Sequence, residues 1–98
     1  MKYYEFATES SHKLEDVVAV LEAAVGPATV KYSGQDYYEV HFKNKYVRRV
    51  AYIYLNYLFG DPTNPESGIL IRIGRGGLYS EGMIVKLEQH LGGFLCDE

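Results

Sequence analysis

Glu39 and His41 are the side chains whose types and spacing most directly suggest catalysis. They lie two positions apart in the segment DYYEVHFK, and residues at this spacing in a strand point to the same face. A carboxylate and an imidazole in contact could exchange a proton, as general acid–base chemistry requires. A solvated strand face gives the same pattern without chemistry, so a small acid–base enzyme is kept as an alternative and no catalytic residue is assigned.

A glycine-rich turn at residues 74–77 (GRGG) is the second candidate site. Backbone amides of such a turn, with neighbouring arginines, could hold an anion or a nucleotide. The spacing fits neither known phosphate motif: Met83 and Ile84 stand where a P-loop has Lys and Ser/Thr, and Tyr79 occupies the last glycine of the dinucleotide fingerprint. Anion or nucleotide binding is therefore an alternative. Its residues are Arg72, Gly74, Arg75, Gly76 and Gly77.

The histidines and the single cysteine indicate neither a metal site nor a disulfide. His12, His41, His90 and Cys96 show no metal-ligand spacing, so we expect no metal and no cofactor. One cysteine cannot form an internal disulfide, which favours a cytoplasmic location. The start of the sequence lacks the apolar region of a signal peptide, and no apolar run is long enough for a membrane span, so no membrane partner is expected.

Residues 43–60, KNKYVRRVAYIYLNYLFG, combine bulk with positive charge. They contain four of the ten tyrosines and four basic residues, and they contain no carboxylate. Tyrosines interleaved with cations could bind nucleic acid, but the net charge of −3 makes nucleic acid the less favoured partner. A core of 98 residues cannot satisfy ten buried phenol hydroxyls, so several tyrosines must be exposed, as at protein interfaces.

The leading functional hypothesis is therefore a non-enzymatic cytoplasmic binding protein. It would act through a Tyr-rich interface on a protein partner or on a second copy of itself, as a homodimer. Small acidic chains of this kind suit inhibitor or immunity-type roles. The predicted partner-binding residues are Tyr46, Arg48, Arg49, Tyr52 and Tyr57.

The flanking elements are predicted from periodicity. Residues 2–8 and 68–74 are rich in β-branched and aromatic residues and predict strands, and residues 28–43 predict a hairpin around Gly34-Gln35. Apolar residues at helical spacing predict helices over residues 13–25 and 80–91. The 98 residues are expected to form a single domain, 1–98.

Residues 46–58 decide the fold class. Asn44 is a good helix N-cap, Gly60 a good C-terminal stop, and Asp61-Pro62 follows, so a helix is predicted over this stretch. The resulting order is α+β, a ferredoxin-like βαββαβ antiparallel sheet with helices on one face plus an extra C-terminal helix. The alternative makes residues 46–58 a strand of a larger antiparallel sheet, because Val, Ile and Tyr dominate the segment.

Overall fold

The computed structural model describes residues 3–44 and 50–96. In this part of the chain eight elements follow one another. They are β1 (Tyr3–Glu9), α1 (Leu14–Val25), β2 (Ala28–Gly34), β3 (Tyr37–Phe42), β4 (Ala51–Phe59), β5 (Glu66–Gly74), α2 (Ser80–Leu91) and β6 (Phe94–Leu95). Neither described helix is long and apolar enough to cross a membrane.

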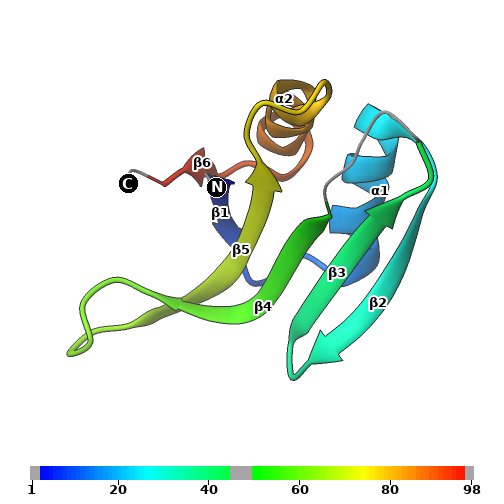
Figure 1. The fold of residues 1–98 in the computed structure, drawn as a ribbon. Helices are drawn as coiled ribbons and strands as arrows, with labels where there is room; N and C mark the ends of the chain where they lie inside the picture. Colours follow the sequence, from blue (N-terminus) through cyan, green and yellow to red (C-terminus); the bar gives the residue numbers. More distant parts are fainter. Residues whose placement is uncertain (1–2, 45–49, 97–98) are drawn as a thin grey trace.

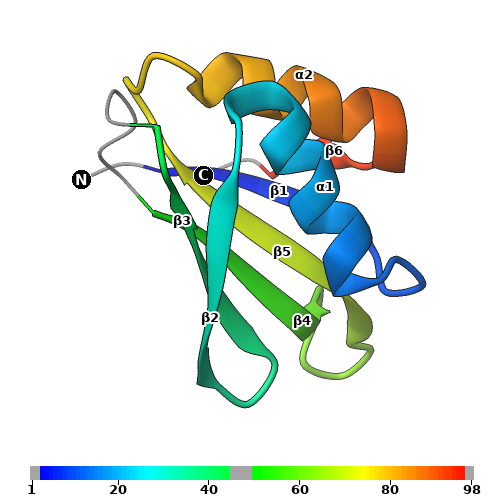
Figure 2. The ribbon, with the colours of Figure 1, turned by 90° about the vertical axis from the view of Figure 1, so that its right-hand side faces the viewer.

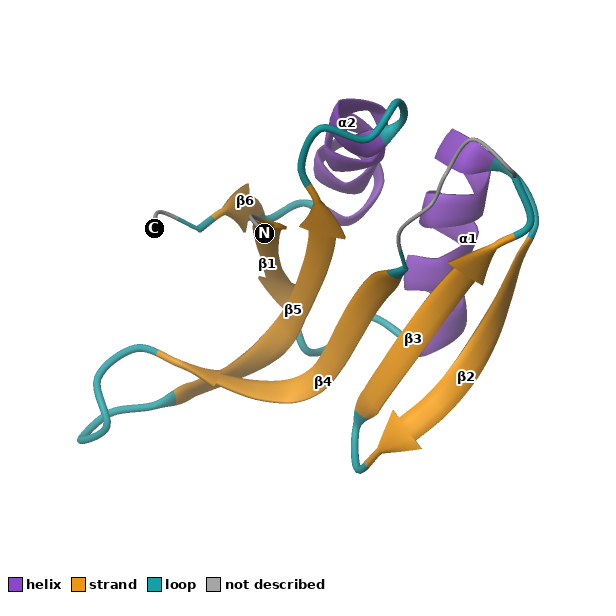
Figure 3. Ribbon diagram, in the orientation of Figure 1, coloured by secondary structure: helices purple, strands orange, loops and turns teal. Residues whose placement is uncertain are grey.

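The described strands form one six-stranded antiparallel sheet in the order β2-β3-β4-β5-β1-β6. Helices α1 and α2 lie side by side on the same face of this sheet, as the two ribbon views show (Figures 1 and 2). The β4–β5 hairpin projects beyond them, at the lower left of Figure 3. The molecule is accordingly elongated, with extents of 43 × 26 × 25 Å.

The core fills the space between the helices and the sheet. Alternate strand residues point toward the helices, and apolar residues at helical spacing on α1 and α2 meet them. The largest fully buried side chains are Phe6, Leu21, Ile53, Ile69, Ile71, Ile73, Leu87, Val17 and Val40. Because α1 and α2 cover one face only, the opposite face of the sheet has no described helix over it.

Most of the predicted elements are confirmed. The helices appear at Leu14–Val25 and Ser80–Leu91, and the hairpin appears as β2 and β3. The first strand and the strand at residues 68–74 appear as β1 and β5. The α+β class is thus correct, while the ferredoxin-like strand order is not confirmed, because the sheet runs 2-3-4-5-1-6.

The helix predicted over residues 46–58 is wrong, and the strand alternative is correct where the chain is described. Ala51–Phe59 forms β4, which pairs with β3 on one side and β5 on the other. Neighbouring strands satisfy its backbone groups and bury Ile53 between sheet and helices, which outweighs the end signals of Asn44 and Gly60. β4 also contains a bulge, in which Asn56 has a φ of 54° and the pairing shifts between Tyr54 and Tyr57.

Candidate functional site

The face of the sheet opposite the helices carries a continuous group of aromatic side chains, which we call the tyrosine face. Strand alternation directs them away from the core, and the bulge in β4 brings Tyr57 onto the same side as Tyr54. They come from β1, β3 and β4, which lie in one sheet (Figure 1). The members of the tyrosine face are Tyr3, Tyr37, Tyr52, Tyr54, Tyr57 and Phe59.

Each ring of the tyrosine face contacts the next. Tyr37 stacks on Tyr54 with centroids 4.6 Å apart, and it lies nearly parallel to Tyr52 at 6.0 Å. Tyr3 meets Tyr52 edge-on at 6.0 Å, and Tyr57 meets Tyr54 edge-on at 5.9 Å. Phe59 closes the row, 4.9 Å from Tyr57. These are the offset and edge-to-face geometries that aromatic pairs prefer, so the rings form one ordered surface.

Charged side chains flank the aromatic row in cross-strand register. Glu5, Arg72 and Tyr52 are direct neighbours on β1, β5 and β4. The Arg72 guanidinium lies 4.9 Å from the centroid of the Tyr3 ring, and its Nε is 3.2 Å from Glu5 Oε2. Arg72 is thereby fixed by a cation–π contact and an ion pair, and its planar group extends the surface made by the rings.

Packing on this face changes the acidity of its phenols. Burial, reinforced by the neighbouring Tyr54, raises the pKa of Tyr37 to about 12. Burial also raises the pKa of Tyr52, with Tyr3 and Glu39 adding to the effect. Burial opposes the charge of Arg72, but hydrogen bonding with Tyr54 and the carboxylate of Glu5 outweigh it and raise the Arg72 pKa. The phenols of Tyr37 and Tyr52 are therefore harder to ionise than that of a free tyrosine.

Glu39 and His41 are brought together as their spacing predicts. The distance from His41 Nε2 to Glu39 Oε1 is 2.8 Å, and the Ser33 hydroxyl donates to the other carboxylate oxygen at 3.1 Å. The hydrogen bonds from His41 and then Ser33 lower the pKa of Glu39. Both oxygens of the carboxylate thus have partners on an open strand face, and acid–base catalysis by this pair stays a prediction.

The glycine-rich turn does not gather its two arginines. Arg72 lies on the tyrosine face. Arg75 instead lies 4.9 Å from the ring of Tyr4, and the Tyr4 side chain points to the helix side of β1. The hydroxyl of Ser80 donates to the carbonyl of Gly74 at 2.5 Å and so ties the turn to the start of α2. Anion binding at Gly74–Gly77 stays a prediction. Arg72 and Arg75 are not placed to bind one ligand together.

The predicted partner-binding residues divide into two groups. Tyr52 and Tyr57 lie on the tyrosine face, while Tyr46, Arg48 and Arg49 fall outside the described residues. The sequence prediction missed the contribution of β1 and β3. The signal was present, because strand alternation already separates Tyr3 from Phe6 and Tyr37 from Val40.

No group of three His, Cys, Asp or Glu side chains among residues 3–44 and 50–96 could hold a metal ion. Comparison of the chain with protein-family models, with curated proteins and with solved structures found no match.

Proposed function

We propose that this protein is a non-enzymatic binding protein whose tyrosine face docks onto a basic surface of a protein partner. One observation carries the proposal: six aromatic rings make a continuous row on the sheet face that α1 and α2 leave open. Inhibition of a basic enzyme, such as a nuclease, is the kind of role that a small protein with this surface suits.

The aromatic row supplies contact area at low entropic cost. Tyrosine side chains have few rotatable bonds, and here neighbouring rings already fix their orientations. Tyr57 is the most exposed member of the tyrosine face, with 40% of its surface accessible. Aromatic residues of this type are enriched at interfaces and among the residues that dominate binding energy.

The charges on the same face favour a basic partner. The described strands present four carboxylates and two cations on this side: Glu5, Glu9, Glu39 and Glu66 against Lys31 and Arg72. One of the cations, Arg72, is already paired with Glu5. Glu39 is already bonded to His41 and Ser33. Glu9 and Glu66 remain, and with the aromatic faces they complement Lys and Arg side chains by ion pairing and cation–π contact.

The test compares two exposed tyrosines. Partners captured from the native source are purified and titrated by calorimetry against the wild type, Tyr57→Ala and Tyr32→Ala. Tyr32 is 67% exposed but lies on the helix side of the edge strand β2, so it is the matched control. We expect Tyr57→Ala to weaken binding by about 2 kcal/mol, roughly 30-fold, and Tyr32→Ala to leave it unchanged.

Circular dichroism must show that both variants keep the wild-type spectrum. Binding to a basic partner should also weaken as salt is added, because opposite charges are screened. Equal affinities of wild type and Tyr57→Ala for every captured partner would contradict the proposal. Sedimentation could instead show that the wild type is a dimer and that Tyr57→Ala is a monomer. The partner of the tyrosine face would then be a second copy of the chain.

A further inference from the structure

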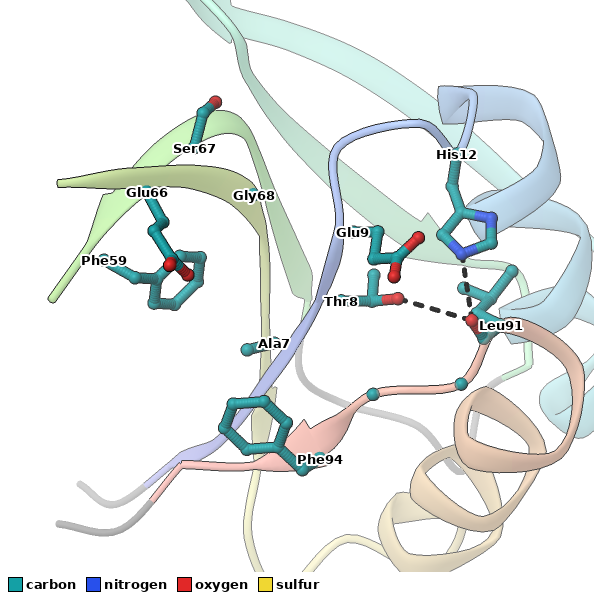
Figure 4. A pocket seen from close by; sticks show the side chains of 12 residues that line it. Ala7, Thr8, Glu9, His12, Phe59, Glu66, Ser67, Gly68, Leu91 and Phe94 are labelled. Carbon is teal, nitrogen blue, oxygen red and sulfur yellow. Dashed lines mark hydrogen bonds between the residues drawn. The ribbon is translucent and has the colours of Figure 1, made fainter.

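A cavity lies at one end of the tyrosine face, between the β4–β5 hairpin and the segment that joins α2 to β6. Its volume is about 500 Å³, within the range of roughly 300–1,000 Å³ that small-ligand pockets occupy. The floor consists of small residues: Ala7 on β1, Gly68 on β5 and Gly93 before β6. Phe59 and Phe94 stand on either side of Ala7 (Figure 4).

Two glycines create the space. A Cβ atom at Gly68 would lie 2.9 Å from the Thr8 carbonyl oxygen and 3.0 Å from Cε2 of Phe59. Because Gly68 has no side chain, the Phe59 ring can lie low against the strand. Gly93 has a φ of 116°, and a Cβ there would collide with the carbonyl oxygen of Ala7. The chain can therefore pass close to β1 and place Phe94 as the second wall.

The lining of the cavity is acidic. Glu9 and Glu66 contribute carboxylates, and none of the described lining residues is Lys or Arg. His12 adds an imidazole whose Nε2–H donates to the carbonyl of Leu91 at 2.9 Å, which holds the ring at the rim (Figure 4). Phe94 is 64% exposed, so its ring is open to a ligand. Two aromatic rings and two carboxylates around an apolar floor match a cation that carries an apolar stem.

We propose that this cavity receives an arginine side chain of the partner. The inference rests on the proposed function. The cavity adjoins the tyrosine face, because Phe59 lines the cavity and its ring centroid is 4.9 Å from that of Tyr57. The planar guanidinium stacks on Phe59 or Phe94 and donates to the carboxylate of Glu66, the cross-strand neighbour of Phe59. The carboxylate of Glu9, at the His12 end of the cavity (Figure 4), adds negative charge. The aliphatic stem covers Ala7 and the two glycines.

The direct test needs no partner. Blocked arginine (N-acetylarginine methylamide) is titrated into the full chain and followed by NMR, and blocked citrulline, its uncharged analogue, is the control ligand. We expect saturable shifts at Gly68, Gly93 and Phe94 for arginine, with a dissociation constant on the order of 1 mM, and none for citrulline. Glu66→Gln and Phe94→Leu should each weaken arginine binding by about fivefold, and Tyr32→Ala should not change it.

The contrary outcomes are distinct. Equal shifts with arginine and citrulline, or none with either, overturn the site. Blocked lysine binding as tightly as blocked arginine overturns the choice of a guanidinium. With a purified partner, an unchanged affinity of Glu66→Gln beside a weakened Tyr57→Ala overturns the arginine site and leaves the proposed function intact. Unchanged partner affinity in both variants, with blocked arginine still bound, instead overturns the proposed function.

Discussion

Tyr37 and Tyr54 stack across the β3–β4 pair with ring centroids 4.6 Å apart and planes 26° from parallel. Such a pair stabilises a fold by about 0.5–1.5 kcal/mol beyond the burial of its surface. A double-mutant cycle with Tyr37→Leu and Tyr54→Leu should therefore give a coupling energy of this size in urea unfolding. Tyr54→Leu combined with Val85→Ala, an exposed position on α2, should be additive to within about 0.5 kcal/mol. Additivity of both pairs would show that the stack does not stabilise the sheet.

The phenol of Tyr37 should make stability fall at alkaline pH. Its pKa rises from the ordinary 10.0 to about 12 in the folded chain, so the folded state binds this proton more tightly than the unfolded state. Its contribution is complete below pH 10 and is lost as the pH rises from about 10 through about 12. In urea unfolding across this range, Tyr37→Phe should lose less stability than the wild type. Parallel curves for the two proteins would contradict the raised pKa.

The strand assignment of β4 predicts a large loss of stability at one apolar position and almost none at another. Ile53 is fully buried, and Leu58 is 65% exposed. Ile53→Ala should lower the free energy of unfolding by about 2–5 kcal/mol, and Leu58→Ala should change it by less than about 0.5 kcal/mol. In the helix predicted for this stretch, Leu58 would share one face with Tyr54 and Leu55, at the i+3 and i+4 spacing of an apolar stripe that packs on the core, and its truncation would give a large loss. Chemical denaturation of the two variants therefore tests the strand directly.

The sequence predicted the elements whose local pattern agrees with their environment. In α1 and α2 the apolar residues recur at helical spacing because one side of each helix faces the sheet. In β3, Val40 alternates with Glu39 and His41 because one face is buried and the other is open. For these elements the pattern depends only on which side meets the core, so it can be recognised without knowing the fold.

β4 could not be predicted in this way. Its bulge at Asn56 places Tyr54 and Tyr57, three positions apart, on the same face, and this spacing resembles helical periodicity. The strand order is likewise decided by partners distant in the chain, since β1 pairs with β5 and β6. The candidate surface was therefore predicted in part: Tyr52 and Tyr57 were named, but their meeting with Tyr3 and Tyr37 depends on that order.

Gly93 should be sensitive to replacement. Its φ of 116° is unfavourable for other residues, and a Cβ atom would collide with the carbonyl of Ala7. Gly93→Ala should therefore cost at least about 1–3 kcal/mol and loosen the pairing of β6 with β1. Gly82→Ala is the matched control, because Gly82 lies in α2 with open space around it and should stabilise the helix by about 0.5–1 kcal/mol. Thermal unfolding of both variants checks the difference, and equal melting temperatures would contradict it.

The β4–β5 hairpin beyond the bulge extends past α1 and α2 (Figure 1), and none of the described helices packs beneath its tip. Strand pairing protects the amide protons of the tip from exchange with solvent. Those around Ile53 are protected by strand pairing and also by the core beneath them. Hydrogen–deuterium exchange should accordingly be graded along β4, slow near Ile53 and faster toward Leu58, because the tip can open without unfolding the body. Tyr57 and Phe59 lie in this part. A ligand held by these two residues would slow amide exchange at the hairpin tip and leave exchange in the rest of the sheet unchanged. Exchange at the tip would therefore measure ligand binding without any added label.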